Sequence, residues 1–245
     1  MHGYKFIDHE KKIAELATRI GFQQVSVSHE VSLQIRFVER GDTTVLDAYL
    51  TPVLKKYINQ LENNFKGDLG HRLMFMQSNG GLAGPKFFQG KDAILSGPAG
   101  GVVGMVKTAE PVGFERLIGF DMGGTSTDVC HYAGQYERSF ETEVAGVRMR
   151  APMMHINTVA AGGGSILFYR DGRFQVGPES AGAQPGPICY GRGGTKPTIT
   201  DANLILGRLN PESLLSVENP VSIETVQNKV LDDVGRDLGF KGMEE

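Results

Sequence analysis

The sequence has little cysteine and lacks both a basic run and a long apolar run. Its two cysteines, Cys130 and Cys189, are too few for a disulfide framework, so we expect reduced thiols and a cytoplasmic protein. The formal net charge is −3 with no basic cluster, which argues against nucleic acid as a partner. No apolar stretch of about 20 residues occurs, and the N-terminus has no signal-peptide core, so we expect no membrane span.

Several common catalytic and metal-binding motifs are also absent. The chain has no G-x-x-x-x-G-K phosphate loop, and the glycines of "GPAGGVVG" do not have the spacing of a dinucleotide-binding fingerprint. No serine lies in a G-x-S-x-G turn, and no group of histidines and cysteines has the spacing of a structural zinc site. The sequence therefore does not fit the familiar nucleotide loops, serine hydrolases or zinc domains.

Glycine, in contrast, is abundant. The chain has 33 glycines in 245 residues, which is about twice the usual share for a globular protein. They gather in short runs beside apolar segments instead of forming a linker. Such runs are typical of places where the backbone comes close to a ligand.

The first half of the chain has the pattern of an α/β fold. Apolar spacing predicts a helix over 8–20 and a second over 45–61. Thr43 or Thr44 is the expected cap of the second helix, and Pro52 is expected to kink it or to restart it.

Strands are expected between and after these helices. Alternating β-branched residues predict extended chain over 25–37, and the apolar run over 72–76 predicts a buried strand. Residues 93–95 are expected to form another strand, followed by a helix capped by Ser96 or Gly97. Helices that alternate with strands in this way indicate an α/β protein.

The second half begins with a predicted hairpin over 117–132. More strands are expected over 147–178, interrupted by Gly162–Gly164 and by a turn at Asp171-Gly172. A long loop rich in glycine and proline then covers 178–197, and loops of that length are usually functional or disordered. Helices are expected again from Asp201 and after Pro220.

The turn of the predicted hairpin, residues 121–128, reads Asp-Met-Gly-Gly-Thr-Ser-Thr-Asp. The tight turn at Gly123 and Gly124 leaves backbone N–H groups pointing the same way, and such a nest binds an anion, particularly phosphate. The hydroxyl groups of Thr125 and Ser126 add donors. The alternative is an ordinary glycine hairpin with an exposed polar tip.

Carboxylates stand at both ends of this turn. Asp121 follows a strand and repels phosphate, but it can hold Mg²⁺ or a water of Mg²⁺ that in turn binds phosphate oxygens. Asp128 can do the same or brace the turn. Gly162–Gly164 can approach a nucleotide or a substrate, or can form a strand bulge. Asp201 is a candidate metal or substrate contact, or else the cap of its helix.

Six segments together resemble the hydantoinase A / 5-oxoprolinase family. The turn 121–128 looks like the second phosphate motif of the sugar-kinase and actin-like ATPase superfamily. Five further motifs occur in the family's order between His9 and Pro211: "SNGG" (78–81), "LSGPAGGVVG" (95–104), "TVAAGGGSI" (158–166), "VGPESAGAQPGPICYGRGG" (176–194) and "PTITDANLILGRL" (197–209).

The resemblance implies an α/β chain with the actin-like ATPase (ribonuclease H-like) fold that uses ATP and Mg²⁺. It implies that the parent protein opens a cyclic amide such as hydantoin, N-methylhydantoin or 5-oxoproline after phosphorylation of the carbonyl, with a second subunit or domain like hydantoinase B. By this resemblance Asp121 and Asp128 are catalytic, with Asp121 and Asp201 as metal ligands. The nucleotide would contact the glycines and hydroxyls: Gly123, Gly124, Thr125, Ser126, Gly162, Gly163 and Gly164.

The resemblance also implies a partial copy of the fold. The superfamily uses two phosphate hairpins, but the chain has one, and family members are several hundred residues long. We therefore expect residues 1–115 to be the end of an N-terminal lobe with a connecting segment, and residues 116–245 to be a second lobe. Two alternatives stay open: the ATPase-like subunit of an acetone or acetophenone carboxylase, and a truncated nucleotide- or partner-binding domain without activity.

Overall fold

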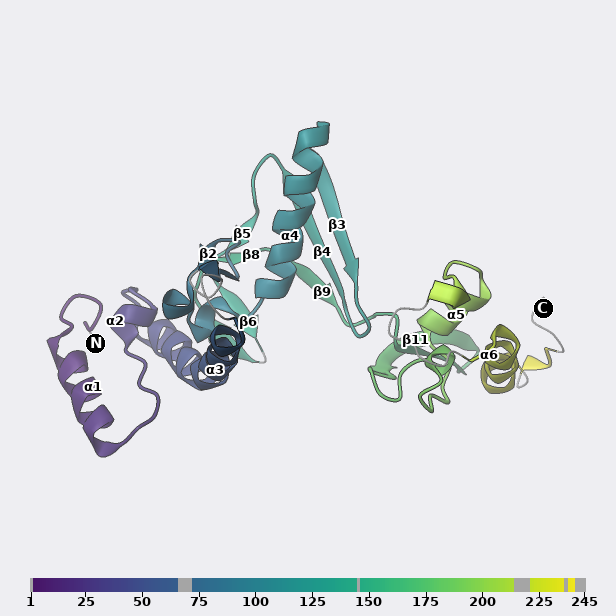
Figure 1. The fold of residues 1–245 in the computed structure, drawn as a ribbon, viewed down its shortest axis with the longest axis horizontal. Helices are drawn as coiled ribbons and strands as arrows, with labels where there is room; N and C mark the ends of the chain where they lie inside the picture. Colours follow the sequence, from purple (N-terminus) through teal and green to yellow (C-terminus); the bar gives the residue numbers. More distant parts are fainter. Residues whose placement is uncertain (1, 66–71, 145, 214–220, 236–237, 241–245) are drawn as a thin grey trace. The chain divides into compact units, whose positions relative to one another are not determined.

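The computed structural model shows helices alternating with strands along the chain (Figure 1), which confirms the predicted α/β class. It describes residues 2–65, 72–144, 146–213, 221–235 and 238–240. The chain forms two compact units, each of which contains two stretches of sequence. Unit 1 comprises Met1–Gly119 and Cys130–Ile156, and unit 2 comprises Phe120–Val129 and Asn157–Glu245. The division into lobes at residue 115 stays a prediction.

The α-helices are α1 (Asp8–Ile20), α2 (Ser28–Val31), α3 (Phe37–Asn64), α4 (Ser96–Ala109), α5 (Ile199–Ile205) and α6 (Ile223–Val230). The strands are β1 (Phe75–Met76), β2 (Leu82–Ala83), β3 (Arg116–Met122), β4 (Thr127–Ala133), β5 (Arg138–Ser139), β6 (Thr142–Val144), β7 (Val147–Met149), β8 (Met153–Met154), β9 (Asn157–Val159), β10 (Ser165–Arg170) and β11 (Arg173–Ser180). Helices α1 and α6 and the turn at Asp171-Gly172 confirm their predictions.

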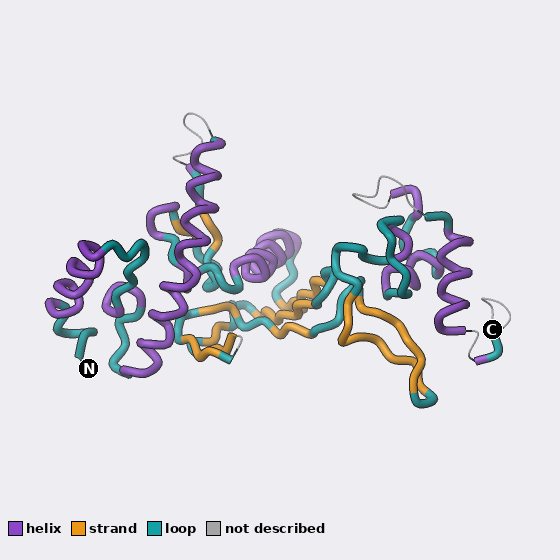
Figure 2. Tube along the Cα trace, turned by 90° about the horizontal axis from the view of Figure 1, so that it is seen from below, coloured by secondary structure: helices purple, strands orange, loops and turns teal. Residues whose placement is uncertain are grey.

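Helix α3, seen lengthwise in Figure 2, is longer than predicted. The expected start at Thr43 or Thr44 is wrong, because both residues lie inside the helix. Their hydroxyl groups donate hydrogen bonds to the carbonyl oxygens of Glu39 and Arg40, one turn earlier, at 2.8 and 2.7 Å. Pro52 also lies inside this single 28-residue helix instead of dividing it.

Two of the predicted strands of unit 1 are absent from the described residues. The segment 25–37 contains the short helix α2, since the Glu10 carboxylate accepts hydrogen bonds from the Ser28 hydroxyl and from the His29 backbone and ring. Residues 93–95 form a turn in which the Leu95 backbone N–H donates to the Ser78 hydroxyl at 3.2 Å. The strand expected over 72–76 is reduced to β1, which pairs with β2.

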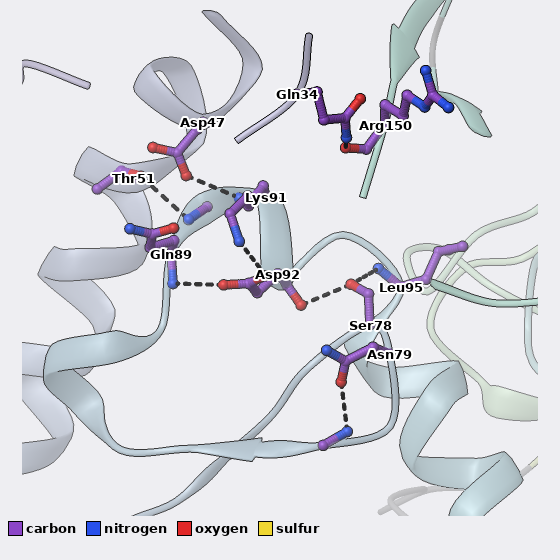
Figure 3. Close-up of polar contacts among 12 residues, drawn as sticks. Gln34, Asp47, Thr51, Ser78, Asn79, Gln89, Lys91, Asp92, Leu95 and Arg150 are labelled. Atoms are coloured by element: carbon purple, nitrogen blue, oxygen red, sulfur yellow. Dashed lines mark hydrogen bonds and ion pairs between the residues drawn. The ribbon is translucent and has the colours of Figure 1, made fainter. Parts of the chain in front are cut away.

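Hydrogen bonds join α3 to the short 3-10 helix at Gly90–Asp92 (Figure 3). The Asp47 carboxylate accepts from the Lys91 backbone N–H at 3.1 Å, and the Thr51 hydroxyl accepts from Gly90 at 3.2 Å. A Cβ on Gly90 would lie 2.9 Å from the Asp47 carbonyl oxygen, so only glycine allows this approach. Two buried apolar clusters pack against α3, one that contains Ile58 with Leu54 and one that contains Met149 with Leu46.

Unit 2 is built on the antiparallel pair β10–β11 and a small apolar core. Asp171 and Gly172 close this pair with positive φ angles of 55° and 76°. The core contains Ile188, Cys189, Leu204 and Val226, from the loop after β11 and from helices α5 and α6.

The hairpin predicted over 117–132 is confirmed by β3 and β4. These two strands and β9 form a three-stranded sheet in the order β3-β4-β9. Strand β4 pairs with β9 in antiparallel register, with Thr127 opposite Val159. The glycines 162–164 separate β9 from β10, as expected. The tip of the hairpin therefore belongs to unit 2, together with the segment that carries these glycines.

Candidate functional site

The tip of the β3–β4 hairpin is a tight turn that faces solvent. The Gly123 backbone N–H donates to the Ser126 carbonyl oxygen at 2.8 Å, which closes the turn. Gly123, Gly124 and Thr125 are exposed, and Ser126 is half-buried. The turn therefore presents peptide groups and hydroxyl groups to solvent, as a phosphate-binding nest requires.

The triple glycine 162–164 lies directly against this turn. The backbone N–H groups of Gly163 and Gly164 donate to the carbonyl oxygens of Gly123 and Gly124 at 2.9 and 2.7 Å. A Cβ on Gly162 would lie 2.7 Å from the Gly123 carbonyl oxygen and 2.8 Å from the Ser126 nitrogen. Two glycine motifs that are far apart in the sequence thus form one backbone assembly, which we call the glycine platform (residues 123–126 and 162–164).

The end of β11, the loop after it and the first turn of α5 support the glycine platform through contacts with Gly163 and Gly164. The Gly163 carbonyl oxygen accepts hydrogen bonds from both the backbone N–H and the hydroxyl of Thr200, each at 2.8 Å. The Gly164 carbonyl oxygen accepts from the Ala181 N–H at 2.8 Å. A Cβ on Gly164 would lie 2.9 Å from the Ser180 hydroxyl oxygen. The platform is therefore fixed on two sides by backbone contacts.

Asp128 braces the hairpin. Its Oδ1 accepts a hydrogen bond from the Thr158 hydroxyl on β9 at 2.6 Å, and the side chain is half-buried. The neighbouring Thr127 hydroxyl donates to the Ala161 carbonyl oxygen at 2.6 Å. The sequence left two roles open for Asp128, metal binding and bracing of the turn, and its contact with Thr158 supports the second.

Asp121 is the acidic group at the tip that is available to a cation. It is exposed near the end of β3, and within the described residues its carboxylate has neither a hydrogen bond nor an ion pair. An exposed carboxylate beside a turn that suits phosphate matches the donor set of Mg²⁺, which binds through one or two carboxylates plus phosphate oxygens.

Asp201, in contrast, is fully buried and receives hydrogen bonds on both carboxylate oxygens. Oδ2 accepts from the Ile188 N–H at 3.1 Å and from the Thr198 N–H and hydroxyl at 2.9 and 2.8 Å, while Oδ1 accepts from the Cys189 N–H at 2.8 Å. Thr198 is the N-cap of α5, and Asp201 completes a reciprocal capping box. The geometry supports the structural reading, and its metal role stays a prediction.

Burial, with the nearby Asp201 charge, raises the pKa of the Cys189 thiol to about 12. Cys189 is therefore a neutral core residue rather than a nucleophile. No group of three histidine, cysteine or acidic side chains in the described ranges has metal-binding geometry. If the site holds a metal, that metal needs ligands from phosphate or water besides Asp121.

All the predicted site residues lie in unit 2, and the two groups of glycines meet at the hairpin tip, but sequence reasoning missed several residues that hold them. Thr200 fixes Gly163, Thr158 pairs with Asp128, and Ser180 packs against Gly164. Thr158 and Thr200 lie inside quoted motifs, but nothing in the spacing identifies their partners.

Comparison with known proteins decides the family. The Hydantoinase/oxoprolinase family profile matches residues 40–245. The chain belongs to the hydantoinase/oxoprolinase family. It is 50% identical over 222 residues to 5-oxoprolinase 1 of Arabidopsis thaliana, and 41% identical over 221 residues to caprolactamase subunit alpha of Pseudomonas jessenii. These alignments cover 90% and 86% of this chain.

Two solved structures have a similar fold. The ATP-dependent caprolactamase of Pseudomonas jessenii matches 97% of this chain with a TM-score of 0.75 and 35% identity. A nucleotide-free acetone carboxylase matches 98% of it with a TM-score of 0.78 and 25% identity. The chain spans 18% of the Arabidopsis 5-oxoprolinase, 32% of the caprolactamase subunit and 35% of each solved chain. None of the helices in the described part has both the length and the hydropathy needed to cross a bilayer.

Proposed function

We propose that this chain is the part of an ATP-dependent cyclic amidohydrolase that binds the phosphates of the nucleotide. The observation that carries the proposal is the glycine platform, in which the largely buried triple glycine holds the exposed hairpin tip through backbone contacts. The cyclic amide is of the hydantoin, N-methylhydantoin or 5-oxoproline type. The parent fold is that of the actin-like ATPases, of which this chain is a partial copy.

The residues of the platform fit a bound Mg²⁺ and nucleotide phosphate. Glycine at 162 and 164 allows a backbone approach that any Cβ would block, so the turn keeps its shape without side chains in the way. Thr125 and Ser126 offer hydroxyl donors, and Asp121 offers an exposed carboxylate for the metal. When bound, ATP supplies the phosphoryl group that converts an amide oxygen into a leaving group.

The residues of this chain contribute positioning and electrostatics. Peptide N–H groups and hydroxyls at the tip are held in position before the nucleotide binds, so they stabilise the negative charge of its phosphates. Stabilisation by donors held in advance is the main source of catalysis in phosphoryl transfer. Asp128 keeps the turn in place through Thr158. Asp201 acts at a distance, because it organises the first turn of α5, from which Thr200 holds Gly163.

The identities of the relatives favour a cyclic amide over a ketone as the substrate. Among the solved structures, identity is 35% with the caprolactamase and 25% with the acetone carboxylase, and identity with the curated 5-oxoprolinase reaches 50%. A second subunit or domain of the hydantoinase B type would complete the enzyme. We also propose a cytoplasmic location, because two cysteines are too few for a disulfide framework.

Calorimetric titration with Mg·ATP tests the proposal. We expect the parent chain to bind, and Asp121→Ala to lose at least tenfold in affinity, because the metal loses its carboxylate. Glu115→Ala is the matched control, since this exposed acid lies just before the other end of the same strand. Equal binding by Asp121→Ala would remove Asp121 from the site. If the folded parent chain does not bind Mg·ATP, the platform alone is not a nucleotide site.

A further inference from the structure

Unit 1 contains a second candidate site that none of the motifs predicts. It is a pocket of about 390 Å³ between the segment before α3 and the segment after β7. Gln34, Arg36 and Arg150 supply its polar lining. These residues come from parts of the sequence that are more than 100 positions apart.

The backbone on both sides of this pocket is fixed. The Gln34 side-chain amide donates to the Arg150 carbonyl oxygen at 2.9 Å (Figure 3), and the Arg150 N–H donates to the buried Thr43 hydroxyl at 3.0 Å. The Gln34 carbonyl oxygen in turn accepts from Arg40 at 2.6 Å. Because these hydrogen bonds already hold the backbone on both sides, less backbone entropy is lost when a ligand binds.

The pocket carries a net positive charge. Arg36 pairs with Glu39 at 3.3 Å, whereas Arg150 makes no ion pair with any carboxylate that the structure describes. Figure 3 shows the Arg150 side chain extending away from the Gln34 amide. None of the described residues that line the pocket is acidic. A guanidinium group without a carboxylate partner favours a bound carboxylate or phosphate, with which it forms two parallel hydrogen bonds.

The rest of the wall is apolar. Ile35 and Phe140 are exposed by 73% and 62%, and Ala151 and Pro152 complete the wall. An apolar wall beside two arginines suits a ligand that has both an anionic group and a hydrocarbon body. A polyphosphate has no such body, so the combination favours a small organic carboxylate.

We propose that this pocket binds a small cyclic carboxylate, with Arg150 and Arg36 on the carboxylate and Phe140 against the ring. As an account of substrate choice, this inference rests on the proposed function. It then separates a lactam that carries a carboxylate, such as 5-oxoproline, from an uncharged lactam such as caprolactam. Arg150 is a specificity-determining residue in this scheme and takes no part in phosphate binding at the platform.

Calorimetric or ligand-observed NMR titration of this chain tests the inference with three probes. These are 5-oxoproline, 2-pyrrolidinone, which is the same ring without the carboxylate, and Mg·ATP as a competitor. We expect 5-oxoproline to bind at least tenfold more tightly than 2-pyrrolidinone. Arg150→Leu and, separately, Arg36→Gln should abolish that difference. Arg148→Leu is the matched control, because Arg148 lies two residues earlier on β7 and outside the pocket.

Three outcomes would overturn the inference. One is equal affinity for the two rings, and another is an Arg150→Leu variant that keeps the preference for 5-oxoproline. The third is displacement of 5-oxoproline by Mg·ATP from both the parent chain and Arg148→Leu, since the pocket would then be a nucleotide site and not a carboxylate site. Mg·ATP binding that depends on Asp121 would meanwhile leave the proposed function intact.

Discussion

Gly162 lies so close to Gly123 that no side chain fits between them. A Cβ on Gly162 would be 2.7 Å from the Gly123 carbonyl oxygen, and backbone atoms of Gly124 and Ser126 are equally near. Because these neighbours are backbone atoms, they cannot turn aside as a flexible side chain would. The contact therefore sets the distance between the hairpin tip and the start of β10.

We predict that Gly162→Ala lowers the free energy of unfolding by about 1–3 kcal/mol, the usual cost of overpacking. It should also weaken Mg·ATP binding, since the tip must move. Gly101→Ala is the control, because Gly101 is exposed in α4 and a Cβ there meets nothing within 4 Å. That change should be neutral or stabilising by up to about 1 kcal/mol. Denaturant unfolding measures both variants, and equal stability of the two would contradict the contact.

Asp201→Ala should reduce the free energy of unfolding by at least about 2 kcal/mol, because a buried carboxylate with several donors and a helix cap are lost together. Glu224→Ala removes another acid from the first turn of a helix, but an exposed one, and should change stability by less than about 0.5 kcal/mol. Urea titration compares them. If Asp201→Ala keeps the parent's stability but loses Mg²⁺ affinity, the metal role is right and the cap reading is wrong.

The Glu10 contacts predict a dependence of stability on pH. Burial alone would raise the pKa of Glu10, but hydrogen bonds from Ser28 and His29 outweigh it and hold the pKa below the ordinary value of 4.5. A lowered pKa in the folded state adds stability above about pH 4.5, and this stability is lost as the pH falls through the folded-state pKa.

Glu10→Gln should therefore lower the melting temperature near neutral pH, and the difference from the parent should shrink below about pH 4. Glu15→Gln, on the exposed part of α1, is the control and should show no such trend. Thermal melts across pH 3–7 test this. A difference that stays constant over the range would mean that the Glu10 charge contributes nothing.

The solvent-facing side of α3 predicts a contrast between two positions on one helix. Val45, Tyr49, Val53 and Tyr57 recur every four residues, are between 54% and 78% exposed, and line an apolar pocket of about 720 Å³. Tyr49→Glu should leave the free energy of unfolding within about 0.5 kcal/mol of the parent while reducing binding of the dye ANS. Ile58→Glu, at a position only 4% exposed, should prevent stable folding. Comparable losses at the two positions would contradict the exposure of this face.

The sequence was most informative where local chemistry decides the structure. Glycine and hydroxyl residues between two apolar runs predicted the β3–β4 hairpin, and Asp171-Gly172 predicted the β10–β11 turn, because each needs only neighbouring residues. Helix α1 was recognised from its apolar spacing and from Gly21, which ends it in a left-handed conformation.

Long-range contacts explain the failures. The threonines at 43 and 44 looked like helix caps, but their hydroxyls donate to carbonyl oxygens inside the helix. The Thr43 hydroxyl also accepts a hydrogen bond from the Arg150 backbone N–H, which is 107 positions away in the sequence. Residues 25–37 alternate like a strand, yet the segment contains the short helix α2, whose Ser28 hydroxyl donates to the Glu10 carboxylate and accepts from the Arg40 guanidinium. The contact of the triple glycine with the hairpin tip was equally invisible, because no sequence spacing records which carbonyl a glycine approaches.

The burial of Cys189 makes the rate of its reaction with a thiol reagent a measure of local opening in unit 2. With a pKa of about 12, the thiol at neutral pH is thiolate in only on the order of one molecule in 10⁵, and it is also shielded within the core of unit 2. A thiol reagent can modify it only when the loop before α5 moves away. Its labelling rate, measured beside that of the less buried Cys130, therefore counts the opening events of the segment that supports the glycine platform, without any engineered probe.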